Sequence, residues 1–181
     1  KQFSSAVSKT LHLQAIMNET IQVIKDTMDV ETIYICMQEM PGGPYRGLYS
    51  DKPLSDLSFA LEEENPLIRW LKNNDEPMIY KEFRYTVEYK SMWESEKSSL
   101  EKMGIKCCAA LKDDSQLTGV ILLADRSRKA HIGYGDLQLL SSIISVASIA
   151  IKNASLYEQA WNEARTDEMT GLLNRKYFYE V

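Results

Sequence analysis

The sequence predicts an α+β fold, in which strands joined by short turns are combined with several helices. Apolar residues recur every three or four positions from Ser5 to Met28, which is the period of an amphipathic helix. Two strand-like runs, residues 105–111 and 117–124, flank the polar turn Asp113-Asp-Ser115. The stretch from Asp136 to Arg165 contains neither proline nor glycine and keeps an apolar period throughout, which predicts one long helix.

The first half of the chain predicts a hairpin followed by a short helix. Residues 32–38 are rich in β-branched and aromatic side chains, Pro41-Gly-Gly-Pro44 interrupts them, and an extended pattern resumes at residues 45–50. Asn65-Pro66 is typical of a helix start, with asparagine as the N-cap and proline in the first turn. Asn73-Asn74 is expected to end this helix.

The middle of the chain predicts a further strand and a further helix. Residues 77–83 are expected to be a strand, and residues 87–103 a single helix whose apolar positions lie among alternating charges. Gly104 is placed to cap that helix at its C-terminus. The strand pair 105–124 comes next, with Gly119 allowing a close backbone approach.

Composition limits the classes of function. A net charge of −5 and the absence of a basic stripe argue against a nucleic-acid partner. The longest uncharged run, residues 137–151, is shorter than the roughly 20 residues that a membrane-spanning helix needs. We therefore expect no membrane segment in this part of the protein. The chain begins with Lys-Gln-Phe and ends abruptly, so we expect it to be a piece of a longer protein.

The cysteines and histidines offer no reactive site. The adjacent Cys107 and Cys108 would point to opposite faces of a strand, so the three cysteines form no disulfide framework and a reducing cytoplasm is expected. His12 and His131 have no acidic or cysteine partner at metal-ligand spacing. We expect no catalytic residues and no metal or other cofactor in this segment.

The last residues resemble the opening of GGDEF domains, the diguanylate cyclases that join two GTP molecules into cyclic di-GMP. That opening reads Asp-x-Leu-Thr-Gly-Leu-x-Asn-Arg-x-x-Phe, and Met169 stands here in place of the first leucine. The matching residues are Asp167, Thr170, Gly171, Leu172, Asn174, Arg175 and Phe178. The resemblance implies a cyclase domain, using GTP and Mg²⁺, of which residues 167–181 are only the start.

A second resemblance, over about residues 11–158, is to the GAF domain, a small-molecule-sensing module. The segments Gln116 to Asp125, Asp136 to Leu140 and Asn153 to Tyr157 match its C-terminal plan of strand, loop and helix. The resemblance implies a central antiparallel sheet with helices on one face, a ligand cavity on the other and a long C-terminal signalling helix. We divide the chain into an N-terminal helix (residues 1–30), a GAF-like domain (31–152), a helix extension (153–166) and the cyclase start (167–181).

The long C-terminal helix carries a stripe with the alternating spacing of a coiled-coil seam. Its members are Leu140, Ile143, Ala147, Ala150, Ala154, Tyr157, Trp161 and Ala164. We predict a parallel homodimer through this seam, which the N-terminal helix could join. The alternative for residues 137–151 is a broad apolar face that packs entirely within one domain.

A candidate ligand pocket combines aromatic residues, at the place where GAF domains carry their ligand cap, with one face of the first strand. Its residues are Tyr34, Cys36, Gln38, Phe83, Tyr85, Tyr89 and Trp93. The mixed polarity of the strand face indicates a pocket for an unidentified small molecule. The alternative, weighed evenly, is that the aromatic side chains simply fill the cavity. GAF domains that attach a bilin commonly have a Cys followed by His, and no cysteine here has that neighbour.

These observations predict a regulatory sensor that dimerises and passes a small-molecule signal through its C-terminal helix to a diguanylate cyclase domain. The segment itself is expected not to be an enzyme. The alternative function is a ligand-free structural dimerisation domain in front of a degenerate GGDEF domain.

Overall fold

The computed structural model describes residues 2–53, 59–127 and 131–179, and the side chains of residues 7–53, 59–127 and 131–165. One antiparallel sheet has the strand order β3-β2-β1-β6-β5-β4. Its strands are β1 (Thr32–Gln38), β2 (Tyr45–Ser50), β3 (Ala60–Leu61), β4 (Met78–Ile79), β5 (Ile105–Asp113) and β6 (Gln116–Ala124). The α+β prediction is confirmed.

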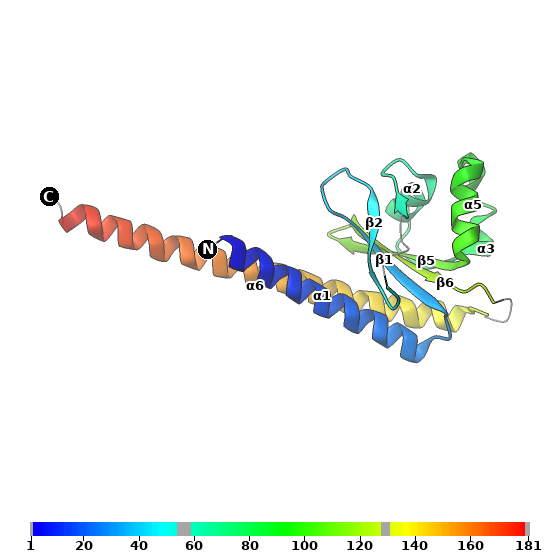
Figure 1. Ribbon diagram of the computed structural model, residues 1–181, viewed down its shortest axis with the longest axis horizontal. Helices are drawn as coiled ribbons and strands as arrows, with labels where there is room; N and C mark the ends of the chain where they lie inside the picture. Colours follow the sequence, from blue (N-terminus) through cyan, green and yellow to red (C-terminus); the bar gives the residue numbers. More distant parts are fainter. Residues whose placement is uncertain (1, 54–58, 128–130, 180–181) are drawn as a thin grey trace.

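Helices cover both faces of the sheet (Figure 1). Helix α1 (Gln2–Thr27) and helix α6 (Tyr134–Tyr179) lie side by side along one face, and α6 projects beyond the sheet as an arm. The other face carries α2 (Pro66–Asn73), α3 (Tyr80–Phe83), α4 (Val87–Ser91) and α5 (Glu94–Met103). The arm therefore begins on the sheet face opposite the small helices.

Each face of the sheet has its own hydrophobic core. Under α1 and α6, Ile24 and Leu140 pack with one set of strand residues that includes Cys107. Under α2 to α5, Phe83 packs with the other set, which includes Cys108. Adjacent residues of a strand point to opposite faces, so these two cysteines lie in different cores, as the sequence predicted.

Local signals in the sequence place several element boundaries correctly. The Asn65 side chain accepts a hydrogen bond from the Leu67 N–H at 2.9 Å, and Pro66 opens α2. Gly104, with φ at 72°, ends α5 in the left-handed conformation that glycine adopts without a steric penalty. Asp114 and Ser115 adopt positive φ in the tight β5–β6 turn.

The sequence predicts one strand over residues 77–83, but the structure does not form it. Only Met78 and Ile79 pair with β5, and the next residues form α3. Tyr80 and Phe83 are both buried in the same core. A helical turn brings residues three apart onto one face, whereas a strand would point them to opposite faces. Burial of this pair therefore favours the helix.

The single helix predicted for residues 87–103 is two helices. Met92 is extended, with ψ at 145°, and Met92 is buried while Trp93 is exposed. The Trp93 N–H donates to the Glu96 carboxylate at 2.9 Å, which starts α5. The break turns Met92 into the core, and the second helix begins with its own cap.

Helix α6 is longer than the predicted helix, Asp136 to Arg165. It begins at Tyr134, next to a hydrogen bond from the Gly133 N–H to the Asp136 carboxylate at 2.9 Å. It continues to Tyr179, since residues 166–179 contain no proline and Gly171 is their only glycine. The side chains of the cyclase-like motif lie outside the described residues.

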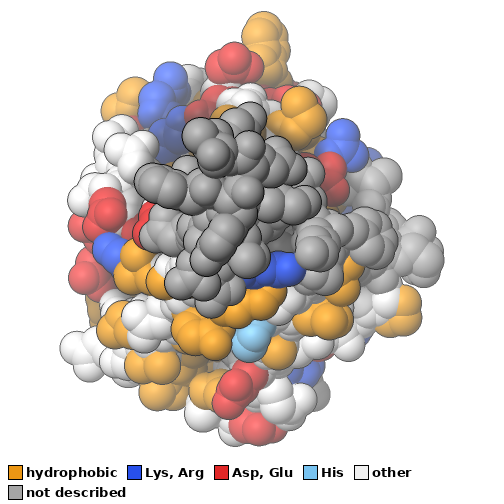
Figure 2. Space-filling view, turned by 90° about the vertical axis from the view of Figure 1, so that its left-hand side faces the viewer, with side chains coloured by type: hydrophobic (Ala, Val, Ile, Leu, Met, Phe, Trp, Pro, Cys, Tyr) orange, Lys and Arg blue, Asp and Glu red, His pale blue; other side chains and the backbone are white. Residues whose placement is uncertain are grey.

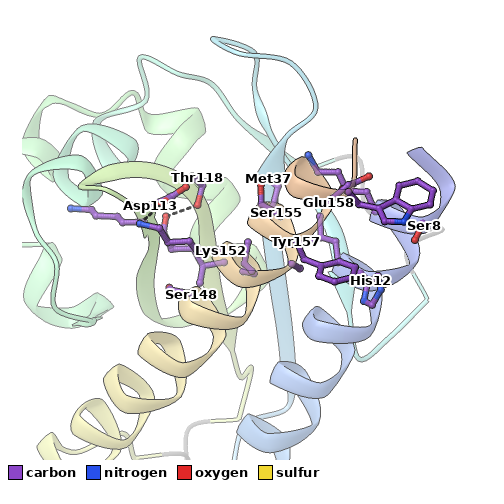
Figure 3. A pocket seen from close by; sticks show the side chains of 17 residues that line it. Ser8, His12, Met37, Asp113, Thr118, Ser148, Lys152, Ser155, Tyr157 and Glu158 are labelled. Atoms are coloured by element: carbon purple, nitrogen blue, oxygen red, sulfur yellow. Dashed lines mark hydrogen bonds and ion pairs between the residues drawn. The ribbon is translucent and has the colours of Figure 1, made fainter. Parts of the chain in front are cut away.

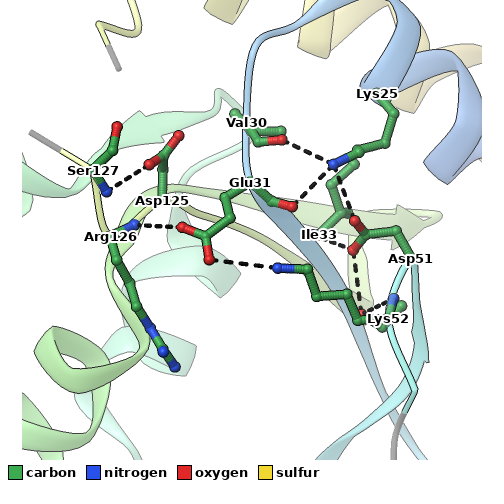
Figure 4. A network of polar contacts seen from close by, with 10 residues as sticks. Lys25, Val30, Glu31, Ile33, Asp51, Lys52, Asp125, Arg126 and Ser127 are labelled. Atoms are coloured by element: carbon green, nitrogen blue, oxygen red, sulfur yellow. Dashed lines mark hydrogen bonds and ion pairs between the residues drawn. The ribbon is translucent and has the colours of Figure 1, made fainter. Parts of the chain in front are cut away.

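A polar network fastens the end of α1 to the sheet (Figure 4). The Lys25 ammonium lies 3.1 Å from the Asp51 carboxylate and also donates to the Glu31 carbonyl at 2.9 Å. The Asp51 carboxylate accepts from the Ile33 N–H at 2.9 Å. Burial opposes ionisation of Asp51, but these hydrogen bonds outweigh it and hold its pKa below the usual range. Asp51 is therefore a charged link between β2, β1 and α1.

Candidate functional site

The predicted dimer seam on α6 does not form one exposed surface. Its residues are buried (Leu140, Ala147), half-buried (Ile143, Ala150, Ala154) or exposed (Tyr157, Trp161, Ala164). The first half packs against the protein's own core, so its assignment to a dimer seam is wrong. Packing within one domain, the alternative for residues 137–151, fits Leu140 and Ala147, which are buried. It does not fit the whole range, because Val146 and Ile149 are exposed. Near the sheet, burial of large apolar groups against it decides which face of α6 turns inward.

A different stripe of α6 is exposed. It consists of Leu139, Val146, Ile149 and Leu156, which are separated by seven, three and seven positions. This spacing fits the a and d positions of a heptad repeat, and it places Asn153 at an a position. The stripe lies one residue before the predicted seam and has the same period. Periodicity alone could therefore not decide between them.

The end-on view of the molecule shows hydrophobic side chains gathered around the foot of the helical arm (Figure 2). On α1 the exposed apolar residues include Val7 and Leu11, and on α6 they include Leu156 and Trp161. Exposed apolar side chains of both helices therefore lie near the point where the arm leaves the sheet.

A groove of about 620 Å³ lies where α1 and α6 pass the ends of the inner strands β1, β5 and β6 (Figure 3). Leu13, Leu111 and Ile151 contribute apolar walls, and Tyr157 and Trp161 lie on the part of α6 that leaves the sheet. Tyr157 and Trp161 of the predicted seam thus line a hollow rather than a flat helix surface.

Charged contacts join α6 to the β5–β6 turn beside this groove. The Lys152 ammonium lies 2.9 Å from the Asp114 carboxylate and 3.7 Å from that of Asp113. The hydrogen bond with Asp114 is the main reason why the pKa of Lys152 is raised. The turn therefore anchors α6 at the point where the arm begins to project.

The candidate ligand residues are only partly brought together. Cys36 and Phe83 are fully buried in the core under the small helices, and Tyr34 and Tyr89 pack against that core. Gln38 is engaged with the turn after β1, since its amide donates to the Gly43 carbonyl at 2.8 Å and to Glu63.

Tyr85 and Trp93 do not join this group. Both are more than three-quarters exposed, Tyr85 in the connection between α3 and α4 and Trp93 at the start of α5. The helix break explains the exposure of Trp93, because it buries Met92 in its place.

The remaining aromatic side chains pack on one another. The Phe83 ring lies edge-to-face with Tyr89 at 5.7 Å and with Trp70 at 6.3 Å between centroids. Neither the groove beside α6 nor a second hollow at the β4 edge of the sheet is lined by any of the seven predicted residues. In the described part of the chain, Cys36, Phe83 and Tyr89 contribute to the packing of the core under α2 to α5.

The thiols are unsuited to nucleophilic chemistry at neutral pH. Burial raises the pKa of Cys36 and of Cys107 to about 12, and raises that of Cys108 well above its ordinary value. Among residues 2–53, 59–127 and 131–179, no group of three or more histidine, cysteine, aspartate or glutamate side chains is arranged to hold a metal ion.

Comparisons with known proteins give a fold but no sequence family. No family model matches the chain, and no curated protein sequence matches it. Among solved structures, the GAF domain of PixJ from Thermosynechococcus elongatus, in its blue-light absorbing form, has a TM-score of 0.67 at 11% identity, covering 88% of this chain and 96% of that one. The GAF domain/HD domain protein of Geobacter sulfurreducens has a TM-score of 0.64 at 10% identity, covering 80% and 95%. This chain has the GAF fold.

A third GAF domain, from a two-component sensor histidine kinase of Bacillus halodurans, has a TM-score of 0.57 at 15% identity and covers 79% of this chain and 95% of that one. At these identities the likeness establishes the fold, and the site must be argued from this chain's own residues.

The long helix α6 also has the length and apolar composition that crossing a membrane requires, over Tyr134–Arg165. The uncharged run of residues 137–151, from which we expected no membrane segment, is shorter than this helix. Core helices of soluble proteins meet the same criterion, and Leu140 and Ala147 of α6 are buried against the sheet.

Proposed function

We propose that this GAF domain is the regulatory module of a bacterial cyclic di-GMP signalling protein. In this proposal two copies pair through α6, and the paired helices pass a small-molecule signal to a diguanylate cyclase domain that begins at the Asp167 to Phe178 motif. The module acts in the cytoplasm and binds no nucleic acid. GTP and Mg²⁺ belong to the cyclase domain.

The observation that carries the proposal is the continuity of α6. One helix runs from the sheet, past the groove, to Tyr179, so it includes the residues that resemble the cyclase opening. A rigid helix transmits a change in its pairing or rotation directly to a domain attached at its end. The cyclase assignment itself rests on the motif residues.

The exposed stripe supplies the pairing surface in this proposal. Leu139, Val146, Ile149 and Leu156 would remain in water in a monomer. A parallel pair of α6 helices would bury them against their own counterparts, as a heptad repeat requires. Parallel pairing also brings two cyclase domains together, which suits a reaction that joins two GTP molecules, each held by one domain.

The packed core favours a second candidate function, a structural dimerisation domain without a ligand. Cys36 and Phe83, both predicted to line a pocket, are fully buried among other side chains. A domain of this kind would hold two output domains at a fixed separation, and it could precede a degenerate GGDEF domain.

The experiment is to express the protein through the domain beyond Val181 and to measure conversion of GTP to cyclic di-GMP with Mg²⁺. Product formation supports the cyclase proposal. A folded, dimeric protein that forms no product with any compound of a metabolite and nucleotide panel would favour the structural candidate. Thermal unfolding of this domain with the same panel separates sensing from scaffolding, because a ligand of the native state raises Tm.

A further inference from the structure

A second hollow, of about 560 Å³, lies at the β4 edge of the sheet, where the chain passes from β6 towards α6. Its walls come from α3, from the junction of α5 with β5, and from the segment just before α6. None of the residues predicted to bind a ligand lines it. We call it the basic hollow, after Lys81, Arg84 and Lys106.

Positive charge dominates its lining. Lys81, Arg84 and Lys106 are basic residues, His131 is a further nitrogen donor, and Glu101 is the one carboxylate among the described lining residues. No ion pair within 4.0 Å involves any of the three cations in the part of the chain that the structure describes.

Six other lysines of the molecule do have a carboxylate partner within 4.0 Å, namely Lys25, Lys52, Lys72, Lys97, Lys112 and Lys152. In an acidic protein, carboxylates are plentiful partners for exposed cations. Three cations gathered around one hollow without such partners create a local positive potential that attracts an anion.

A β-bulge in the backbone positions one of these cations. The β5–β6 register shifts between Ile105 and Cys107, so that Lys106 is the extra residue of a bulge. A bulge re-aims a side chain that regular pairing would direct elsewhere. Lys106 is half-buried and lines the hollow, although it lies on a strand whose neighbouring side chains are fully buried.

Tyr80 also lines the hollow, although the residue as a whole is buried in the core under α2 to α5. Ile79, Ile105 and Ile132 add an apolar wall that suits the non-ionic part of a small molecule.

We propose that the basic hollow binds a small, multiply charged oxyanion, a phosphate ester or a polycarboxylate, held by Lys81, Arg84 and Lys106. A guanidinium group presents paired donors to either kind of oxyanion, and lysine adds point charges. The bound anion would contact both α3 and the Ile132 segment, which leads directly into α6. Binding at this site needs neither the dimer nor a cyclase domain.

The test is an NMR titration of the 181-residue chain with inorganic pyrophosphate and, separately, with citrate, at matched ionic strength. We expect saturable shifts of the Lys106 and Ile132 amide signals with at least one of the two anions, and the stronger of them identifies the phosphate or the carboxylate source. K106Q and R84Q should each weaken that binding at least tenfold. K90Q is the matched control, because Lys90 is an exposed lysine on α4 outside the hollow.

Arg84 is exposed, so R84Q keeps the test valid if K106Q disturbs the bulge. No saturable shift with either anion would overturn the proposal. Equal weakening by K90Q would overturn it as well, since it would show general charge attraction. Such a failure would leave the proposed function standing, because product formation by the extended protein is measured without reference to this hollow.

Discussion

Replacing Val146 and Ile149 together by glutamate should convert the dimer into a monomer. The two side chains are 68% and 60% exposed in one protomer, so pairing can still remove more than half of their surface from water. Complete burial of such a side chain stabilises by about 1.5–3 kcal/mol, which gives about 1–1.5 kcal/mol for each. Two residues from each of two chains then contribute about 4–6 kcal/mol, or roughly a 10³- to 10⁴-fold change in dimer Kd. Four carboxylates placed in the seam would repel one another and add to this loss.

Sedimentation equilibrium of V146E/I149E and of the unchanged protein measures this difference directly. V87E is the matched control, because Val87 is also an exposed valine but lies on α4, on the other side of the sheet. The control should dimerise normally, and all proteins should keep their circular dichroism spectra. A V146E/I149E protein that dimerises as tightly as the control would refute the assignment of the stripe as the pairing surface.

Three further substitutions test other parts of the account. Asn153 lies at an a position of the stripe, so N153L should strengthen dimerisation but allow antiparallel pairs. Cross-linking of cysteines placed at one end of α6 would detect such pairs. Exclusively parallel pairs would contradict this role of Asn153. L140A should lower the free energy of unfolding by about 2–5 kcal/mol in urea titrations, because Leu140 is fully buried against the sheet. A loss below about 0.5 kcal/mol is typical of a surface substitution and would contradict this burial. The pKa of Asp51 is lowered by folding, so the stability that it adds is present above its unfolded-state pKa and is lost as the pH falls through the folded-state pKa. D51N should therefore lower Tm at pH 7 and converge with the unchanged protein in acid; a pH-independent difference would contradict the charged link.

Elements with strong local signals could be predicted from the sequence. The Asn65-Pro66 start, the Gly104 cap and the polar turn before β6 each satisfy the backbone without help from distant residues. The predictions of a strand over residues 77–83 and of a single helix over residues 87–103 were wrong, because burial in the tertiary structure determines the backbone conformation there. Tyr80 with Phe83, and Met92 in place of Trp93, enter the core only if the chain bends as it does.

The candidate sites were less predictable for the same reason. On α6 two stripes share one period, and only packing on the sheet shows that Leu140 points inward and Leu139 outward. The basic hollow brings Lys81 and Arg84, at α3, together with Lys106 of β5, and the bulge that aims Lys106 leaves no pattern in the sequence.

The central claim is that pairing of α6 controls a cyclase domain. The most direct measurement is the rate of cyclic di-GMP formation by the protein extended through the next domain, with and without V146E/I149E, at equal concentrations of folded protein. We expect product from the unchanged protein and a loss of at least tenfold in the variant, with V87E fully active. Equal rates in the variant and the unchanged protein, or no product from a folded and dimeric unchanged protein, would contradict it.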